Sequence, residues 1–334
     1  MKKVLISLIV VLLVLTTIFA FACKKDVVAE GEYTIVSPDG APALALATFI
    51  KNPQVSEQLK INASVVHNSL IAAEAIKSDF AILPANAAAN LYNKGKEYKM
   101  VGVVTNGNMF FVSNVQNDSF TLETLKGHVL YSIGQGSVPA FIMLNLLKNA
   151  NIPYVENSET ATEGKVAITY VADGQALMTK IKTATSTVYG NLAEPAVTTF
   201  VSKGIMYRVA DVQELWKTST SAEIKGFAQA VLIAKKSLCD EKPEVVNAVF
   251  NAIKASENYV VEQPQEARDL IASAYPETTL PATLVSGVVR NCNVHAYRAS
   301  ENLDYVIATL NAAYNTKAES VGGSVPAKDS GFYY

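Results

Sequence analysis

The chain has 334 residues, of which 50% are hydrophobic and 17% charged, and its formal net charge is −2. This composition is typical of a globular protein and excludes a disordered chain, and the length suits two lobes better than one core. The sequence carries no stripe of basic residues, so nucleic acid is not expected as a partner.

The N-terminus has the pattern of an export signal. Lys2 and Lys3 precede an apolar run from Val4 to Ala22 that ends in small residues. This pattern predicts a secretory signal peptide over residues 1–22. The alternative is an uncleaved membrane anchor, because the apolar run could just span a bilayer. Both interpretations place the rest of the chain outside the cytoplasm and attached to a membrane, in the periplasm or on the cell surface.

Cys23 directly follows the small residue Ala22. This arrangement resembles the bacterial lipoprotein box, in which such a cysteine becomes the lipidated first residue of the mature protein. We therefore expect lipidation of Cys23 and a short polar tether over residues 23–30.

Strands and helices alternate along the first part of the chain. A strand over Tyr33–Val36 runs into the turn Ser37–Pro42 and then into an apolar helix over Ala43–Ile50. The next predicted elements are the strand Ile61–Val66, the helix Ser69–Lys77, the strand Phe80–Leu83, the helix Ala87–Tyr92 and the strands Lys99–Val104 and Met109–Ser113. Asn106-Gly107, between the last two strands, favours a tight turn with positive φ.

The same strand–turn–helix unit returns in the second half of the chain. A strand over Val129–Tyr131 leads into a turn that contains Gly134, Gly136 and Ser137, and a helix over Ala140–Leu147 follows. A turn of this kind exposes backbone N–H groups at the positive end of a helix, where an anionic or hydrogen-bonding ligand can bind. Two such turns in separate halves suggest a ligand held from both sides.

The remaining elements continue the alternation and then become helical. They are a short helix over Leu122–Lys126, the strand Lys165–Val171, the helix Gly174–Thr183, the strand Thr187–Leu192, the helix Ala196–Lys203, the strand Ala228–Ala234 and the helices Lys242–Glu262, Gln263–Ala274, Leu280–Cys292 and Ser300–Ala313. Alternating strands and helices predict an α/β protein with mainly parallel sheets covered by helices on both faces.

The cysteines and histidines give no sign of a metal or a cofactor. Cys239 and Cys292 could pair in an oxidising compartment, but two free thiols are the favoured interpretation. His67, His128 and His295 show no ligand spacing, and no nucleophile–base pair is visible. We therefore expect no metal, no cofactor and no catalysis.

Several short motifs occur together in a characteristic order. They are Ser37–Pro42, Asp79–Asn86, Leu125–His128 followed by Gly134–Ser137, and Glu194-Pro195. In this order they resemble the substrate-binding lipoproteins of bacterial ABC importers. The resemblance is to the group with the type II periplasmic-binding-protein fold, which includes binders of alkanesulfonates, nitrate and thiamine-pyrimidine precursors.

The resemblance implies two α/β lobes, each a mostly parallel sheet flanked by helices, that close over a ligand. Lobe 1 would comprise residues 31–112 and 226–334, and lobe 2 residues 113–225, with hinge crossovers near Val112–Val115 and Ile224–Ala230. A cleft between domains is the default ligand site, and contacts made only in the closed state drive closure. The implied partners are a small molecule, an ABC permease and its ATPase, and the protein is expected to be a monomer.

The candidate ligand-binding residues lie on the predicted turns. They are Ser37, Asp39, Gly40, Asn68, Ser69, Asn86, Asn108, Gly134, Gly136, Ser137, Tyr189 and Glu194. Asn86 is included by resemblance alone. Ser37, Asp39, Asn68 and Ser69 could instead cap helices, and Asn108 could be a hairpin residue.

Tyr189, Asn191 and Glu194 mark the end of a predicted strand. The Glu194 carboxylate could meet an amine or a ring N–H of the ligand, or it could form a salt bridge or lie at a helix N-terminus. The predicted turns contain no Arg or Lys, which favours a neutral, zwitterionic or singly charged guest. An enzyme on the same fold and a ligand-sensing lipoprotein without a transport role are the alternative functions.

Overall fold

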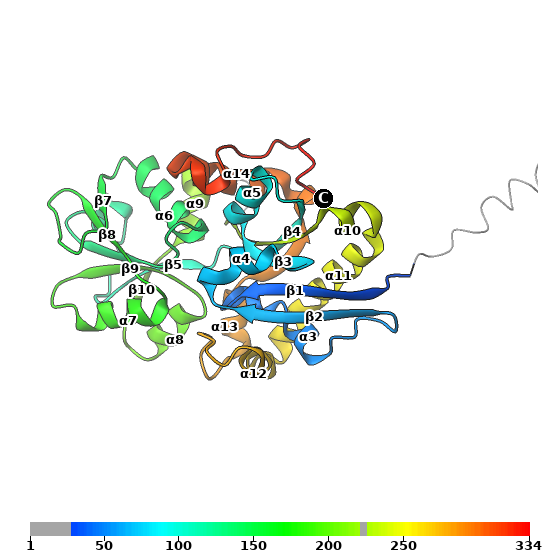
Figure 1. Cartoon of the computed structure of the whole chain (residues 1–334). Helices are drawn as coiled ribbons and strands as arrows, with labels where there is room; N and C mark the ends of the chain where they lie inside the picture. The colour runs from blue at the N-terminus through cyan, green and yellow to red at the C-terminus, as the bar shows by residue number, and fades with distance from the viewer. Residues whose placement is uncertain (1–27, 221–225) are drawn as a thin grey trace, which may run out of the picture.

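The computed structural model describes residues 28–220 and 226–334. The expected signal peptide, Cys23 and most of the tether lie outside this part, as does the start of the expected second crossover. Within the described residues the chain forms two α/β lobes, each built on a six-stranded sheet (Figure 1). The strand orders are β12-β4-β11-β3-β1-β2 in the first lobe and β10-β5-β9-β6-β8-β7 in the second.

Strands of the first sheet come from both ends of the chain. They are β1 (Gly31–Pro38), β2 (Leu59–Val66), β3 (Phe80–Pro84), β4 (Tyr98–Asn106), β11 (Ala228–Lys235) and β12 (Val294–Arg298). β1 runs parallel to β2 and β3, whereas β11 runs antiparallel to β3 and β4. The sheet is therefore mixed, because a strand that returns from the other lobe enters it in the opposite direction.

The second sheet uses one continuous stretch of chain. Its strands are β5 (Met109–Ser113), β6 (Val129–Ser132), β7 (Tyr154–Glu156), β8 (Val166–Tyr170), β9 (Val188–Ala193) and β10 (Tyr207–Asp211). β6, β7, β8 and β9 form parallel pairs, and β5 is antiparallel to both β9 and β10. Parallel neighbours end at the same edge, so the turns after β6, β8 and β9 lie together.

Helices cover both faces of the two sheets (Figure 1). In the first lobe they are α2 (Ala41–Leu44), α3 (Ala47–Lys51), α4 (Ile71–Ala75), α5 (Ala85–Asn93), α10 (Lys236–Glu241), α11 (Pro243–Glu262), α12 (Pro264–Ala274), α13 (Ser286–Asn291) and α14 (Leu303–Thr316), with the short 3₁₀ turns η1 (Asn68–Leu70), η3 (Ala299–Asn302) and η4 (Ala318–Val321). In the second lobe they are α6 (Val138–Asn149), α7 (Gly174–Thr183), α8 (Ala196–Ser202), α9 (Val212–Thr220) and η2 (Leu122–Leu125). None of the helices in the described ranges is long and apolar enough to cross a membrane.

The chain passes between the lobes at Gly107, which corrects two expectations. Met109–Ser113 pairs with β9 in the second sheet, so the first crossover lies one strand earlier than Val112–Val115. Asn106-Gly107 forms no hairpin, and Gly107 is not among the glycines with positive φ. The Gly107 N–H donates to the Phe227 carbonyl oxygen over 2.8 Å, so the outgoing and returning segments lie side by side. A Cβ on Gly107 would stand 2.8 Å from the Phe227 ring, so a larger residue at this position would clash with it.

One hydrophobic core extends through both lobes. It joins residues under the first sheet, such as Leu83 and Val231, to residues of the second, such as Phe141 and Ile168. Helix α14 of the first lobe packs directly on α6 of the second. The lobes are therefore in close apolar contact on the side where these two helices lie (Figure 1).

Most predicted elements form, with differences at a few positions. The helix expected over Ala43–Ile50 is broken into α2 and α3, and the helix expected over Leu280–Cys292 is shortened to α13. The segment after Ala234 is not purely helical, since β12 adds a strand on the edge of β4. Cys239 and Cys292 are both buried and free.

Candidate functional site

The lobes meet where turns at the ends of several strands come together. We call this region the lobe boundary and define it as Pro84–Asn86, Asn106–Met109, Gly134–Pro139 and Asn191–Glu194. These segments follow β3, join β4 to β5, follow β6 and close β9. In open α/β sheets, ligands bind outside the carboxyl ends of strands, which is where the first, third and fourth segments lie.

Asn86 reaches from the first lobe to the second. It is 3% exposed, and its Nδ2 donates to the Gly136 carbonyl oxygen at 3.2 Å and to the Ser320 carbonyl oxygen at 3.3 Å. Its Oδ1 is buried and finds no hydrogen-bond donor among residues 28–220 and 226–334. A residue included only by resemblance thus bridges the lobes and carries a buried acceptor without a donor.

Asn191 occupies the corresponding place in the second lobe. It is fully buried within β9, two residues before the strand ends, and its Nδ2 donates to Ser132 Oγ at 3.1 Å and to the Pro139 carbonyl oxygen at 3.3 Å. Its Oδ1 likewise has no donor within the described part of the chain. Asn191 stands between Tyr189 and Glu194 in the sequence, yet it is absent from the candidate residues, because an asparagine in a strand carries no signal of its own.

Asn108 lies on the crossover between the lobes. Its Nδ2 donates to the Cys292 carbonyl oxygen at 3.0 Å, and its own carbonyl oxygen accepts from the Glu194 N–H at 3.0 Å. The Oδ1 is buried and unpaired with respect to the described residues. Asn108 is therefore a third buried asparagine at the lobe boundary with an unpaired oxygen. The alternative that it is a hairpin residue is wrong.

The turn after β6, Gly134–Ser137, has the backbone conformation that its glycines predict. Gly134 and Gly136 have φ of 75° and 74°, which favours glycine at both positions. A Cβ on Gly136 would meet nothing within 4 Å. Ser137 is the residue before α6, but its Oγ donates to the Gly134 carbonyl oxygen at 2.9 Å and does not cap the helix.

The turn after β1, Ser37–Pro42, has a structural role that its sequence did not predict. Asp39 accepts from Thr278 Oγ1 at 2.5 Å, and from Thr279 N and Oγ1 at 2.7 and 2.6 Å. It therefore holds the loop between α12 and α13 and does not cap a helix. Ser37 is fully buried with its Oγ on the Pro38 carbonyl oxygen, and Gly40, with φ of 93°, precedes the four-residue helix α2.

Glu194 is committed to contacts within its own lobe. Its buried carboxylate accepts from Arg208 Nη2 at 2.7 Å and from Thr198 N and Oγ1 at 2.9 and 2.7 Å, at the start of α8. The alternative of a salt bridge at a helix N-terminus is thus the observed arrangement. Burial and the negative charge of Glu194 raise the pKa of the Cys292 thiol, which keeps that thiol protonated.

Three expected residues lie away from these contacts. Asn68 and Ser69 are exposed in η1 beside the edge strand β2, where the Ser69 N–H donates to His67 Nδ1. Tyr189 is near the start of β9 and not at its end, and its ring packs against Phe120 and His128 in the core. Tyr189 is 3% exposed and is therefore a core residue.

A family model places the chain among known proteins. The model described as NMT1/THI5 like matches residues 60–267, which is more than half of the chain. The chain belongs to this family. A search of curated proteins gave no match.

Solved structures agree with the fold of this NMT1/THI5-like protein. An ABC transporter protein from Parabacteroides distasonis has a TM-score of 0.69 at 22% identity, covering 90% of this chain and 98% of its own. The aliphatic sulphonate-binding protein SsuA from Escherichia coli has a TM-score of 0.64 at 13% identity, with 90% and 95% covered. The alkanesulfonate-binding protein SsuA from Xanthomonas axonopodis pv. citri, bound to MOPS, has a TM-score of 0.59 at 15% identity, with 90% and 96% covered. The expected periplasmic-binding-protein fold is confirmed.

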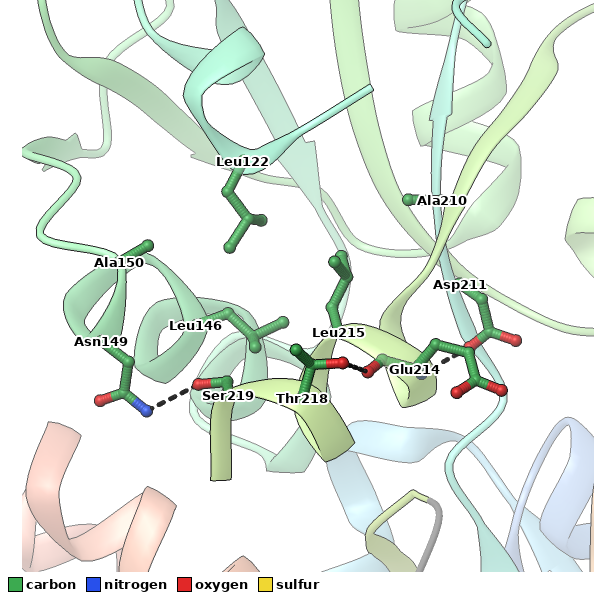
Figure 2. Close-up of a pocket in the computed structure, with 10 residues that line it drawn as sticks. All are labelled: Leu122, Leu146, Asn149, Ala150, Ala210, Asp211, Glu214, Leu215, Thr218 and Ser219. Carbon is green, nitrogen blue, oxygen red and sulfur yellow. Dashed lines mark hydrogen bonds between the residues drawn. The ribbon is translucent and has the colours of Figure 1, made fainter. Parts of the chain in front are cut away.

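A surface groove of about 430 Å³ lies elsewhere in this NMT1/THI5-like protein (Figure 2). It runs between η2, α6 and α9 of the second lobe, and Leu122, Leu146 and Leu215 form its apolar part. Asn149 and Ser219 are hydrogen-bonded at 3.0 Å along one side. The groove contains none of the expected binding residues, so the lobe boundary remains the candidate site on chemical grounds.

Proposed function

We propose that this protein is the solute-binding component of an ABC importer. It would capture a small polar organic molecule between its two lobes and deliver it to the permease, without catalysis of its own. The observation that carries the proposal is the set of buried asparagines at the lobe boundary. Buried polar atoms in proteins are almost always hydrogen-bonded, and a bound ligand is one way in which unpaired ones gain a partner.

Membership of the NMT1/THI5-like family and the likeness to sulfonate-binding proteins support a binding role. The contacts of the two carboxylates on the expected binding turns support it as well. Asp39 and Glu194 are held by threonines and by Arg208, so neither is placed as a general acid or base. An enzyme on the same fold is therefore the weaker alternative.

Thermal unfolding in the presence of candidate ligands tests solute binding directly. A ligand present at a hundred times its Kd stabilises the folded state by about 2.7 kcal/mol through mass action. We expect such a shift from the purified protein lacking residues 1–23, and uptake of the same compound by cells that carry the permease. A thermal shift without uptake would instead favour a sensor.

We further propose that Cys23 anchors the protein to a membrane outside the cytoplasm, where it acts as a monomer. Labelling of cells with a fatty acid, followed by mass measurement of the purified protein, tests the anchor. The parent protein is expected to carry the label and to lack residues 1–22, and the Cys23→Ser variant is expected to carry no label. An unlabelled parent protein that keeps residues 1–22 would favour the uncleaved anchor.

A further inference from the structure

We propose that the ligand is a neutral or cationic molecule rich in N–H or O–H groups, which it donates to Asn86, Asn108 and Asn191. The inference rests on the proposed solute-binding function and names the chemical class that the same site takes. It separates this protein from a sulfonate binder, since a sulfonate group offers acceptor oxygens and no donor.

The orientation of the three side-chain amides is fixed by their partners. Each Nδ2 donates to at least one main-chain carbonyl oxygen, that of Gly136 and Ser320, of Cys292, or of Pro139. A carbonyl oxygen accepts hydrogen bonds and cannot donate them. Exchanging N and O in any of these amides would place two acceptors against each other, so the unpaired atom is the oxygen in every case.

All three oxygens belong to side chains that are at least nine-tenths buried. Asn86, Asn108 and Asn191 are 3%, 1% and 0% exposed. A buried acceptor without a donor is unfavourable, and a ligand that supplies the donor recovers the lost interaction. A ligand without donors leaves the acceptors unpaired and is rejected much more strongly than size alone would predict.

The three residues are linked through segments of the lobe boundary. Asn86 and Asn191 come from different lobes, yet both donate to the turn Gly134–Pro139. Asn108 is tied to the end of the same strand as Asn191 through the Glu194 N–H. The acceptors thus belong to one boundary that both lobes build.

The charged residues near these asparagines also favour a ligand that is not an anion. The turns at the ends of β1, β8 and β9 carry Asp39, Asp173 and Glu194, whereas the lobe boundary segments contain no Lys or Arg. Glu194 and Arg208 form an ion pair and offset each other's charge. The first turn of α6 can donate to a carbonyl or hydroxyl of the ligand, but Pro139 within that turn supplies no N–H. Side-chain acceptors therefore predominate in these segments, and no Lys or Arg stands there to bind an anion.

Two fractions of one small-molecule mixture test the charge class of the ligand, whatever its identity. Yeast extract below 1 kDa is passed over an anion-exchange resin, and the flow-through and the salt-eluted fraction are each added to the protein lacking residues 1–23. We expect the flow-through alone to raise the Tm. A rise with the eluted, anionic fraction alone overturns the inference and leaves solute binding intact. No rise with either fraction contradicts the proposed function itself.

Variants then assign the effect to the asparagines. Asn86→Leu, Asn108→Leu and Asn191→Leu are each expected to require at least tenfold more flow-through for half of the parent Tm shift. Asn145→Leu is the matched control, because Asn145 is a buried asparagine whose Oδ1 accepts from Asn149 at 3.1 Å. Where a Leu variant does not fold, Asn→Ser at that position withdraws the acceptor with a smaller change. Parent-like responses in all three folded variants overturn the inference.

Discussion

Asn86 of the first lobe and Gly136 of the second are joined by a hydrogen bond from side-chain nitrogen to main-chain oxygen, 3.2 Å long. The contact links the turn after β3 to the turn after β6, and it depends on a backbone that only glycine adopts easily at residue 136. Perturbing either partner should therefore change how the lobes meet.

Gly136→Val should abolish ligand binding while leaving the fold intact. The new side chain has open space, but φ of 74° is unfavourable for it by about 1–2 kcal/mol, so the turn must change shape. The ligand-induced Tm shift is the measurement. Gly164→Val is the control, because Gly164 has φ of 70° and equal space but lies away from the lobe boundary. An unchanged shift in Gly136→Val would remove this turn from the site.

Asp39→Ala should release the loop between α12 and α13. It removes three hydrogen bonds to a carboxylate, each of which contributes about 1.5–3 kcal/mol in typical proteins, so we expect a loss of several kcal/mol or local opening. Hydrogen exchange at Thr278 and Thr279 separates the two outcomes. Asp118→Ala, at an exposed site where the carboxylate accepts from Gln116, should have little effect.

Gly107→Ala should push the two crossover segments apart. The added methyl group would stand 2.8 Å from the Phe227 ring and 2.9 Å from Gln213 Cγ, a clash that typically costs about 1–3 kcal/mol. Urea unfolding measures the loss. Gly287→Ala, within α13 and with nothing near its Cβ, should instead be neutral or stabilise by up to about 1 kcal/mol. Equal effects of the two changes would contradict the close approach.

Phe332→Ala should destabilise the first lobe strongly. Phe332 is fully buried against Tyr92, and its carbonyl oxygen accepts from the Met100 N–H at 2.7 Å on the edge of β4. Removing a buried phenylalanine ring costs about 3–5 kcal/mol. Tyr314→Ala, where the residue is 40% exposed, should change the free energy of unfolding by less than about 0.5 kcal/mol. A small loss at Phe332 would mean that the tail does not hold the sheet.

Asp79 should make stability depend on acid pH. Burial of Asp79 acts to raise its pKa, but hydrogen bonds from Lys235 and Thr34 outweigh burial and hold the pKa below its usual value. The stabilisation is therefore present above the unfolded-state pKa of about 3.9 and is lost as the pH falls through the lower folded-state value. Urea unfolding between pH 5 and pH 2 should show a parent-minus-Asp79→Asn difference that shrinks with acid. A constant difference would exclude this ion pair as its source.

Periodicity predicts the α/β class with helices on both faces of the sheets, whereas the arrangement in two lobes with crossovers comes from the resemblance. Short apolar runs such as Phe80–Leu83 could only be buried strands, and Gly174–Thr183 showed clear helical spacing. The crossover at Gly107 was not predictable, because Asn-Gly has the same signature in a hairpin and in a segment that needs glycine for close packing. Only the pairing of Met109–Ser113 with β9 separates the two.

The site could be predicted in part. The strand–turn–helix unit indicates Gly134 and Gly136, and the resemblance adds Asn86; all three lie where the lobes meet. The partners of Asp39 are more than two hundred residues away, and the Arg208 that pairs with Glu194 lies on another element, so local sequence could not assign these carboxylates. The sequence alone could not single out Asn191 as a site residue. Whether its side-chain oxygen has a hydrogen-bond donor depends on residues that lie near it only in the folded structure.

The apolar layer between α6 and α14 also bears on how the molecule folds. Since Phe141, Leu146, Leu310 and Ala313 belong to the same core as residues beneath both sheets, neither half can lose its packing without exposing part of the other. Denaturation should then be a single cooperative transition, with coincident fluorescence and circular dichroism curves, despite an architecture that looks divisible. The backbone amides of the second lobe would reach full protection from hydrogen exchange only once helix α14 has been synthesised and has packed on α6.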